Sequence, residues 1–400
     1  MTPSRPPLFT FRFLALCLFM LLAYCNISVF YNLYPYLEFL GVPQQLRGPI
    51  IASSSLATIA GFLLLTPRLS VKTAPYAIFA GIAMLILCGV GYLFERDVPG
   101  LFALRLINGA GIALMSSSAT TLLVAHIAPE RSGQAFGVYS VAALLPYSIV
   151  PSLFDHIGVL LPSPAWGYAA MSLALVPAAV INLVLLRQHR ADRVKPTGKG
   201  GGAGYAAMLQ SLRTRKTVLM LLLNMVYYLN FGALFFLSKS LFASRGLGNV
   251  RLFFSIQTVL MLLIRVFASR LFDEVKKPLL ILWCNVLTAL GFGMLWAAHS
   301  QLMVVATALM LGLGMGVGPP SLNALMYALS EQPLRAVNSN LMVMSLQAGS
   351  FLGPILGGVA VGMLGYPGFL AVGLAANLGG IWLSVQFLRW DWTGGARQEA

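Results

Sequence analysis

The sequence predicts an all-α membrane protein with twelve transmembrane helices in two pseudo-symmetric six-helix bundles, and three observations carry this prediction. Hydrophobic residues make up 58% of the 400 positions and charged residues only 9%, whereas soluble proteins carry about 25% charged residues. Apolar runs of about 20 residues, the length of a bilayer-spanning helix, recur along the whole chain. The two halves of the chain also share a weak repeat, which indicates a duplicated unit.

The repeat relates the two halves at a nearly constant shift. A Tyr-x-Asn pair inside one apolar run returns after 204 positions, and a glycine motif returns after 203. Because a polar pair in mid-span and a glycine motif recur at almost the same shift, we interpret the halves as homologous. The matched residues are Tyr24 with Tyr228, Asn26 with Asn230, Gly109 with Gly312, Ser118 with Ser321, Ala125 with Ala328 and Arg131 with Arg335.

The apolar runs give six expected spans in each half. They are continuous, whereas a β-barrel would show short strands of alternating polarity. The first run is long, lacks a small-residue cleavage site and precedes further runs, so we expect a retained helix and not a signal peptide. The expected spans are 12–37, 48–66, 74–94, 100–126, 134–158 and 166–187, then 217–242, 250–269, 278–298, 301–328, 338–363 and 367–388.

A polar stretch separates the two sets of spans. It carries seven Lys and Arg residues around a glycine run. A phosphate-binding loop would need Gly-Lys followed by Ser or Thr after a strand, and Lys199 is followed by glycine. We therefore expect an N-terminal bundle at 1–188, a flexible cytoplasmic linker at 189–216 and a C-terminal bundle with a cytoplasmic tail at 217–400. The basic residues of the linker are expected to meet anionic lipid headgroups.

The net charge of +15 could indicate a nucleic-acid partner, but membrane topology explains its distribution better. With the N-terminus inside, inner loops and tails hold 19 of the 26 Lys and Arg residues, outer loops five and spans two. We therefore expect both termini in the cytoplasm, no nucleic-acid partner and, most simply, a bacterial inner membrane. The four cysteines lie inside spans without metal-ligand spacing, so we expect no disulfide framework, metal site or cofactor.

Four short motifs resemble those of the major facilitator superfamily, in the order that this family has them. Together with the twelve expected spans and the basic linker, the resemblance covers roughly residues 11–390. The motifs are Arg105-Leu-Ile-Asn-Gly109-Ala-Gly111-Ile-Ala113 in the fourth span, Pro129-Glu-Arg131-Ser-Gly133 after it, Arg270-Leu-Phe-Asp273-Glu-Val-Lys276-Lys277 after the eighth span, and Gly349-Ser-Phe-Leu-Gly353-Pro354-Ile-Leu-Gly357-Gly358 in the eleventh. The last of these is similar to a glycine-proline motif of antiporters.

Two departures from the family pattern distinguish the halves. In the first half, Val71 stands where the second half has Asp273, so the carboxylate that usually latches the cytoplasmic side is missing there. The antiporter motif belongs in the fifth span, but only Pro146 and Pro151 occur there, without the glycines. The glycines of the fourth and tenth spans are best explained by close helix packing. Pro319 and Pro320 are expected to kink the tenth span.

The resemblance implies a central cavity lined mainly by spans one, four, seven and ten. Uncharged amides and phenols in hydrocarbon need hydrogen-bond partners, which are either one another or a substrate. Arg105, if it does not snorkel to the outer surface, would favour a negatively charged group, and the absence of carboxylates disfavours a strongly cationic solute. The pathway candidates are Asn26, Tyr31, Arg105, Asn108, Tyr147, Tyr227, Asn230, Gln257, Asn323 and Gln347.

Charged residues near the span ends are candidates for gating or coupling. Glu38 and Asp155 lie at outer ends, where a solvated position is the alternative interpretation. Arg265 lies near a cytoplasmic end, where it would snorkel or pair with the gate residues Arg270 and Asp273. No Asp or Glu lies in the middle of any span, which limits the groups available for proton coupling.

The resulting prediction is secondary active transport of a small organic or amphiphilic solute by alternating access. The resemblance adds proton-linked efflux, with protons as the coupling ion, by a protein that is expected to be a monomer. The alternatives are an uptake or facilitated-diffusion carrier and a non-transporting membrane receptor with the same fold. An enzyme is not expected, because the sequence offers no metal-ligand spacing, no Ser/His/Asp cluster and no nucleotide loop.

Overall fold

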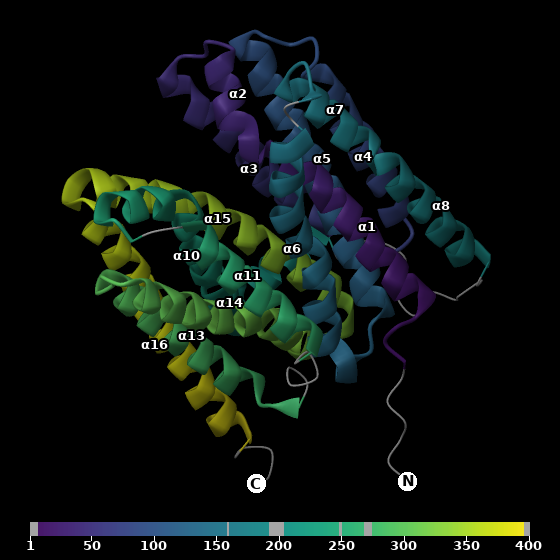
Figure 1. The fold of residues 1–400 in the computed structure, drawn as a ribbon. Coiled ribbons are helices and arrows are strands. Elements are labelled where there is room, and N and C mark those ends of the chain that lie inside the picture. Colours follow the sequence, from purple (N-terminus) through teal and green to yellow (C-terminus); the bar gives the residue numbers. More distant parts are fainter. Residues whose placement is uncertain (1–6, 158–159, 192–203, 248–249, 268–273, 396–400) are drawn as a thin grey trace. The chain divides into compact units, whose positions relative to one another are not determined.

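A computed structural model describes residues 7–157, 160–191, 204–247, 250–267 and 274–395. Within these ranges the chain is helical apart from short connections, and no strand occurs in them. Twelve of the described helical segments are long and apolar enough to cross a membrane. The all-α prediction and the expected number of spans are therefore confirmed (Figure 1).

The helices follow the expected order along the chain. In the first half they are α1 Phe11–Ser28, η1 Val29–Asn32, α2 Leu33–Phe39, α3 Gln44–Leu65, η2 Thr66–Arg68, α4 Ala74–Gly91, α5 Val98–His126, η3 Pro129–Arg131, α6 Ser132–Ile157, α7 Pro164–Leu173 and α8 Leu175–Ala191. In the second half they are α9 Gly204–Arg213, α10 Arg215–Arg245, α11 Val250–Phe267, α13 Lys277–Trp296, α14 Gln301–Leu329, η5 Gln332–Leu334, α15 Arg335–Leu364 and α16 Tyr366–Gly395.

Two spans that were predicted to be single helices are interrupted. The first passes from α1 through η1 into α2, and the sixth is divided into α7 and α8. Proline lacks a backbone N–H and its ring collides with the carbonyl four residues earlier. Four residues before Pro35 is Tyr31, inside η1, and four residues before Pro177 is Leu173, the last residue of α7. The prolines therefore account for both interruptions.

The chain forms two compact units. The first consists of Met1–Ala128, Tyr139–Leu209 and Glu331–Met344; the second consists of Pro129–Val138, Gln210–Ser330 and Ser345–Ala400. Each unit thus includes a short segment from the opposite half of the sequence. Inside the first unit Asn340 Nδ2 donates to Thr121 Oγ1 at 3.1 Å, and inside the second the rings of Phe136 and Tyr327 pack edge to face.

Close backbone contacts show the duplication in three dimensions. In the first unit, Gly111 of α5 lies against the carbonyl oxygen of Gly81 in α4, where an added Cβ would lie 3.1 Å from it. In the second unit, Gly314 of α14 lies against the carbonyl oxygen of Cys284 in α13, where an added Cβ would lie 2.8 Å from that oxygen. Gly111 and Gly314 are 203 positions apart, and so are Gly81 and Cys284, which is the shift of the sequence repeat. Small residues let helices approach where burial from water does not drive association.

The same relation holds for a second pair of helices. Gly109 of α5 packs on the backbone of Ser54 in α3, and Gly312 of α14 packs on the backbone of Gln257 in α11. Ser54 and Gln257 are again 203 positions apart. The α3–α5 and α11–α14 pairs therefore share one packing register, and α14 stays helical through Pro319 and Pro320.

Part of the predicted linker is helical. The helix α8 extends to Ala191, and α9 begins at Gly204, while residues 192–203 lie outside the described residues. The Tyr205 hydroxyl donates to the Leu64 carbonyl at 2.9 Å, and the Arg68 guanidinium lies 5.3 Å from the centre of the Tyr205 ring. The beginning of α9 is thereby attached to the end of α3 within the first unit.

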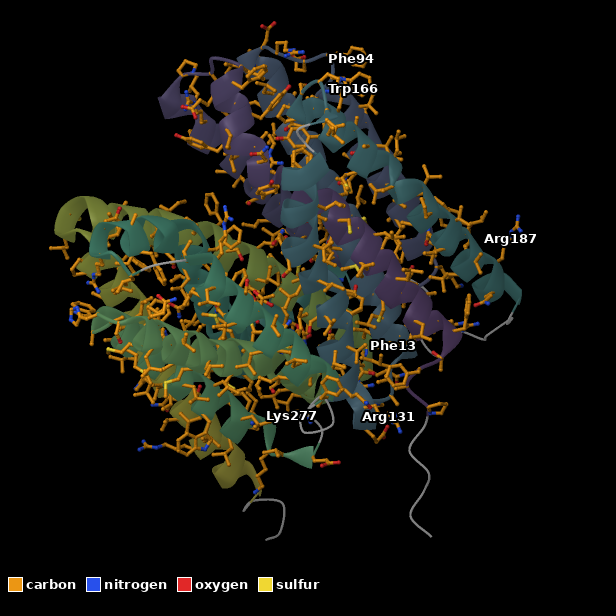
Figure 2. All side chains as sticks on the ribbon, viewed as in Figure 1. Phe13, Phe94, Arg131, Trp166, Arg187 and Lys277 are labelled. Carbon is orange, nitrogen blue, oxygen red and sulfur yellow. The ribbon has the colours of Figure 1, made fainter. Side chains whose placement is uncertain are left out.

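The first unit presents apolar side chains at its surface. Figure 2 shows Phe94 and Trp166 at one end of this unit and Phe13 and Arg187 toward the other. Phe94 and Trp166 are exposed, whereas many serine, threonine and asparagine side chains are buried. This distribution, with apolar residues outside and polar residues inside, suits a hydrocarbon surrounding.

Candidate functional site

Arg105 of α5 lies inside the first unit and is only 7% exposed. Its Nη1 donates to Asn108 Oδ1 at 3.1 Å, and its Nη2 donates to the Ile51 carbonyl of α3 at 3.2 Å. Ser54 of α3 donates to the same Asn108 oxygen at 3.1 Å. The predicted residues Arg105 and Asn108 are therefore brought together in one network that joins α3 to α5.

Aromatic rings surround this network. The Arg105 guanidinium lies 5.2 Å from the centre of the Phe30 ring, a distance suited to a cation–π contact. Phe30 stacks on Tyr168, and Tyr36, Tyr92 and Tyr168 pack edge to face. The Tyr92 hydroxyl lies near Arg105 without meeting hydrogen-bond geometry, so this arginine is held chiefly by carbonyl and amide oxygens.

Asn26, the first-half member of the repeated polar pair, is bonded inside the unit. Its Nδ2 donates to Ser172 Oγ at 2.8 Å, and Ser172 Oγ donates to the Tyr168 carbonyl at 2.8 Å. This chain of bonds ties α1 to α7. Two further pathway candidates lie in ring pairs, Tyr31 with Phe154 and Tyr147 with Tyr24, and both are partly exposed.

Asn230, the second-half counterpart of Asn26, has a different environment. Its side chain is completely buried, and neither its Nδ2 nor its Oδ1 has a hydrogen-bond partner among the described residues. An unsatisfied buried amide costs about 1–3 kcal/mol, so such groups are expected where something else satisfies them. Gln257 of α11 is similar, since its Nε2 reaches only the Met315 sulfur at 3.3 Å and its Oε1 has no described partner.

Arg265 is the most deeply buried charge of the second unit, at 2% exposure. Its Nε donates to the Gly316 carbonyl at 3.1 Å and its Nη2 to the Met315 carbonyl at 3.0 Å. Pro319 and Pro320 explain why these oxygens are available. Each proline lacks the N–H that would bond to the carbonyl four residues earlier, and those residues are Met315 and Gly316. The guanidinium therefore satisfies two carbonyls that the proline pair leaves free.

The remaining pathway candidates of the second unit differ in their bonding. Tyr227 donates from its hydroxyl to the Ile281 carbonyl of α13 at 3.2 Å, which is an interhelical bond. Asn323 donates to the Pro319 carbonyl of its own helix at 2.9 Å. Gln347 of α15 is half-buried and makes no hydrogen bond to the described residues. Of the second-half candidates, Asn230, Gln257 and Gln347 thus keep free hydrogen-bonding capacity.

Two of the gating candidates, Glu38 and Arg265, have described side chains. Glu38 Oε1 accepts from Arg47 Nη1 at 2.9 Å, and the Glu38 side chain is 63% exposed, which fits a position at the rim. The side chain of Asp155 lies outside what the structure describes, as do Arg270 and Asp273. Arg265 makes no ion pair with any described residue, so its bonds to α14 are the contacts that place it.

Several partners in these networks were not foreseen from the sequence. Ser172 lies 146 positions from Asn26, and nothing local to either residue indicates the bond. The contact of Arg265 with α14 did leave a signal, because two consecutive prolines in a helix always free two carbonyls. No group of three or more His, Cys, Asp or Glu side chains that could hold a metal ion occurs within the described ranges.

Comparison with solved structures places the fold among membrane transporters. The chain is similar to the human organic anion transporter MFSD10 (TETRAN), at 15% identity and a TM-score of 0.74, covering 95% of this chain and 100% of that one. It is also similar to a bacterial homologue of the iron transporter ferroportin, at 16% identity, a TM-score of 0.73 and coverage of 95% and 100%. The transporter FucP follows at 15% identity, with a TM-score of 0.66 and coverage of 94% and 98%. At these identities the likeness shows the fold.

Sequence comparison gives the family. No curated protein sequence matches the chain significantly. The family model described as Major Facilitator Superfamily matches residues 16–277 and again residues 220–391. These two matches cover most of the chain, in agreement with the twelve spans and the order of the motifs. The chain is therefore an integral, multi-pass membrane protein that belongs to the major facilitator superfamily.

Proposed function

We propose that this protein is a secondary active transporter that moves a small organic or amphiphilic solute across the membrane by alternating access. The observation that carries the proposal is Asn230, a fully buried amide whose donor and acceptor have no described partner inside an apolar helix bundle. A buried amide without hydrogen-bond partners destabilises the fold, unless a bound solute or a second conformation of the protein supplies those partners. Gln257 and Gln347 extend the same unfilled polar capacity along neighbouring helices.

The candidate side chains favour an uncharged or anionic solute of moderate size. They are amides, phenols and arginines, and the sequence has no carboxylate in the middle of a span to receive a cation. The similar structures include an organic anion transporter and a fucose:proton symporter, so the fold accommodates solutes of these kinds in other proteins. Our proposal that this chain transports small organic molecules is based on its own candidate side chains and not on the solutes of those proteins.

Proton-linked efflux is the direction and coupling that we propose, with uptake as its competitor. Efflux is supported by the resemblance of residues 349–358 to the antiporter motif, and the proton linkage rests on that resemblance alone. The membrane we propose is a bacterial inner membrane with both termini in the cytoplasm, because 19 of the 26 basic residues then lie inside. A C-terminal fluorescent fusion that matures only in the cytoplasm tests this orientation.

The experiment begins with the purified protein and a thermal-shift screen against a library of metabolites and drugs. Solutes that raise the melting temperature are then tested for flux in proteoliposomes, with protein-free liposomes as the blank. Flux that responds to an imposed pH gradient supports the coupling, and flux that ignores the gradient overturns it. Binding without flux would identify a receptor. Asn230→Ala should change the apparent affinity for the solute, whereas Asn377→Ala should not, since Asn377 is equally buried but bonded to its own helix at Gly373.

A further inference from the structure

We infer that Arg265 and Tyr228 of the second unit form a subsite for an anionic group, of the size of a carboxylate, on the transported solute. The inference deepens the proposed function and rests on it for its role in transport. Arg265 lies on α11 and is bonded to α14, and Tyr228 lies on α10, which packs against both of these helices. Three features of Arg265 support the subsite: its charge without a described counter-ion, the fixed orientation of its guanidinium and its absence from the first half.

The first feature is that Arg265 carries a buried charge without a counter-ion in the described part of the chain. It is 2% exposed and forms no ion pair there, and its hydrogen bonds go to two neutral carbonyls. Burying an unpaired charge is costly, and carbonyl oxygens offset that cost only partly. Two neutral N–H donors, such as an amide side chain provides, would satisfy the same two carbonyls. Among the described residues, nothing therefore requires that this side chain be charged.

The second feature is that the guanidinium is held in a fixed orientation. Its Nε and Nη2 are directed at the Gly316 and Met315 carbonyls, which are free because Pro319 and Pro320 lack N–H groups. The third nitrogen, Nη1, makes no hydrogen bond to the described residues. A binding group whose rotamer is fixed by its supporting contacts needs little further ordering when a ligand arrives. Arginine with a free edge suits a carboxylate, because its N–H groups match the two oxygens.

Tyr228 supplies a second donor at this place. Its hydroxyl makes no hydrogen bond to the described residues, and its Cβ packs on Gly349 of α15, where an added Cβ would lie 3.0 Å away. The close contact fixes the backbone from which the phenol extends. Gln257 lies two turns before Arg265 on the same buried stripe of α11. Its Oε1, which has no described partner, is placed to receive the neutral polar part of the same solute.

The third feature is seen by comparison with the equivalent helices of the first unit. At the shift of 203 that relates the packing glycines, Phe62 stands in place of Arg265, and Phe62 is buried. Ser116 and Ser117 stand in place of the two prolines. The α3–α5 pair therefore keeps the register of the α11–α14 pair without an arginine. The arginine and the proline pair are therefore specific to the second half and are not required by the packing that the two halves share.

The test compares probes that differ in charge and hardly in shape. Benzoate and benzamide, and hexanoate and hexanamide, are titrated against the purified full-length protein, with binding followed by thermal shift and by tryptophan fluorescence. We expect the wild type to bind at least one carboxylate about tenfold more tightly than its amide. Arg265→Gln should abolish that preference and leave amide binding unchanged, because glutamine keeps donors for the two carbonyls. Tyr228→Phe should reduce carboxylate binding by about threefold.

Arg251→Gln is the matched control, since Arg251 lies on the same helix in an exposed position and its loss changes the net charge equally. Wild-type protein without any carboxylate preference would overturn the subsite. So would an Arg265→Gln variant that keeps the preference, or one that weakens both members of a pair equally, since that is the effect of a purely structural arginine. Flux of the probes in proteoliposomes separates the two proposals. Carboxylate preference without flux overturns transport and leaves the subsite standing, whereas flux of amides alone overturns the subsite and leaves transport standing.

Discussion

Replacement of Gly353 by alanine gives the sharpest test of the helix packing in the second unit. Gly353 belongs to the glycine-proline motif of α15 and lies against α10. An added Cβ would overlap the Leu229 carbonyl oxygen and would lie 2.9 Å from the Ala233 backbone nitrogen. Both obstacles are backbone atoms of a helix and cannot rotate away, so the two helices would have to separate by about 1 Å.

The expected cost follows from two opposing terms. The added Cβ is expected to destabilise the fold by about 3 kcal/mol, the upper end of the usual range for overpacking, because it meets backbone atoms. Alanine recovers about 1 kcal/mol through its better helix propensity, so the net destabilisation is about 2 kcal/mol. Gly358 of the same motif is the control, because a Cβ there meets nothing within 4 Å. Gly358→Ala should be stabilising by about 1 kcal/mol through helix propensity, so the two variants should differ by about 3 kcal/mol.

The assay is the apparent melting temperature of the detergent-solubilised protein, read with a thiol dye that reports exposure of Cys88 and Cys284, which are buried. For a unit of about 200 residues, 3 kcal/mol corresponds to about 6–12 °C between the two variants. Gly232→Ala tests the same α10–α15 contact from the side of α10, since its Cβ would lie 2.8 Å from the Ser350 carbonyl oxygen. If Gly353→Ala melts as high as Gly358→Ala, the close α10–α15 contact is wrong, and the motif has another role than packing.

Three further predictions address the first unit. Asn26→Ala should lower the melting temperature by a few degrees with solute affinity unchanged, because it breaks a buried bond worth about 1 kcal/mol to Ser172; a change in affinity alone would contradict this assignment. Arg105→Lys should destabilise by about 1–2 kcal/mol in thermal melts, because one ammonium cannot reach both Asn108 and Ile51 as the fork does; an unchanged melt would show that the network contributes nothing. Tyr205→Phe should increase proteolytic cleavage near α9, because it removes the bond to Leu64, and equal cleavage rates would argue against the attachment.

The sequence predicted the spans well because hydropathy measures what the bilayer requires, an apolar run of sufficient length. It was less informative inside a span, where every apolar run looks continuous. The interruptions at η1 and after Leu173 lie four residues before Pro35 and Pro177, but α14 and α15 continue through their own prolines, so a proline by itself did not predict where a span would break. The polarity of the linker predicts flexibility, yet α9 forms there and its tyrosine is bonded to α3.

The candidate site was predicted by residue type but not by bonding state. Asn26 and Asn230 are equivalent in the repeat, and the structure gives one a partner at Ser172 and the other none. Hydrogen-bond partners lie on other helices, at distances along the chain that follow from the fold and not from local sequence. Arg265 illustrates the intermediate case, since the proline pair that frees its acceptors was visible in the sequence while the arginine that satisfies them lies 50 positions earlier.

The pattern of conserved and changed contacts between the halves argues for a division of roles. Packing contacts that use glycine recur at one shift in both units, so the duplicated scaffold has kept its register. The two buried arginines do not recur, because Ala308 stands where the first half has Arg105, and Phe62 stands where the second has Arg265. In the first unit the arginine and Asn26 are engaged by protein partners. In the second, neither atom of the Asn230 amide has a described partner, and one edge of Arg265 makes no described hydrogen bond. The first unit also keeps buried polar atoms without a described partner, among them Arg105 Nε and Asn108 Nδ2. The halves therefore differ in the kind of polar group that they offer a solute: single free atoms of a bonded network in the first, and a wholly unbonded amide beside a separate arginine in the second.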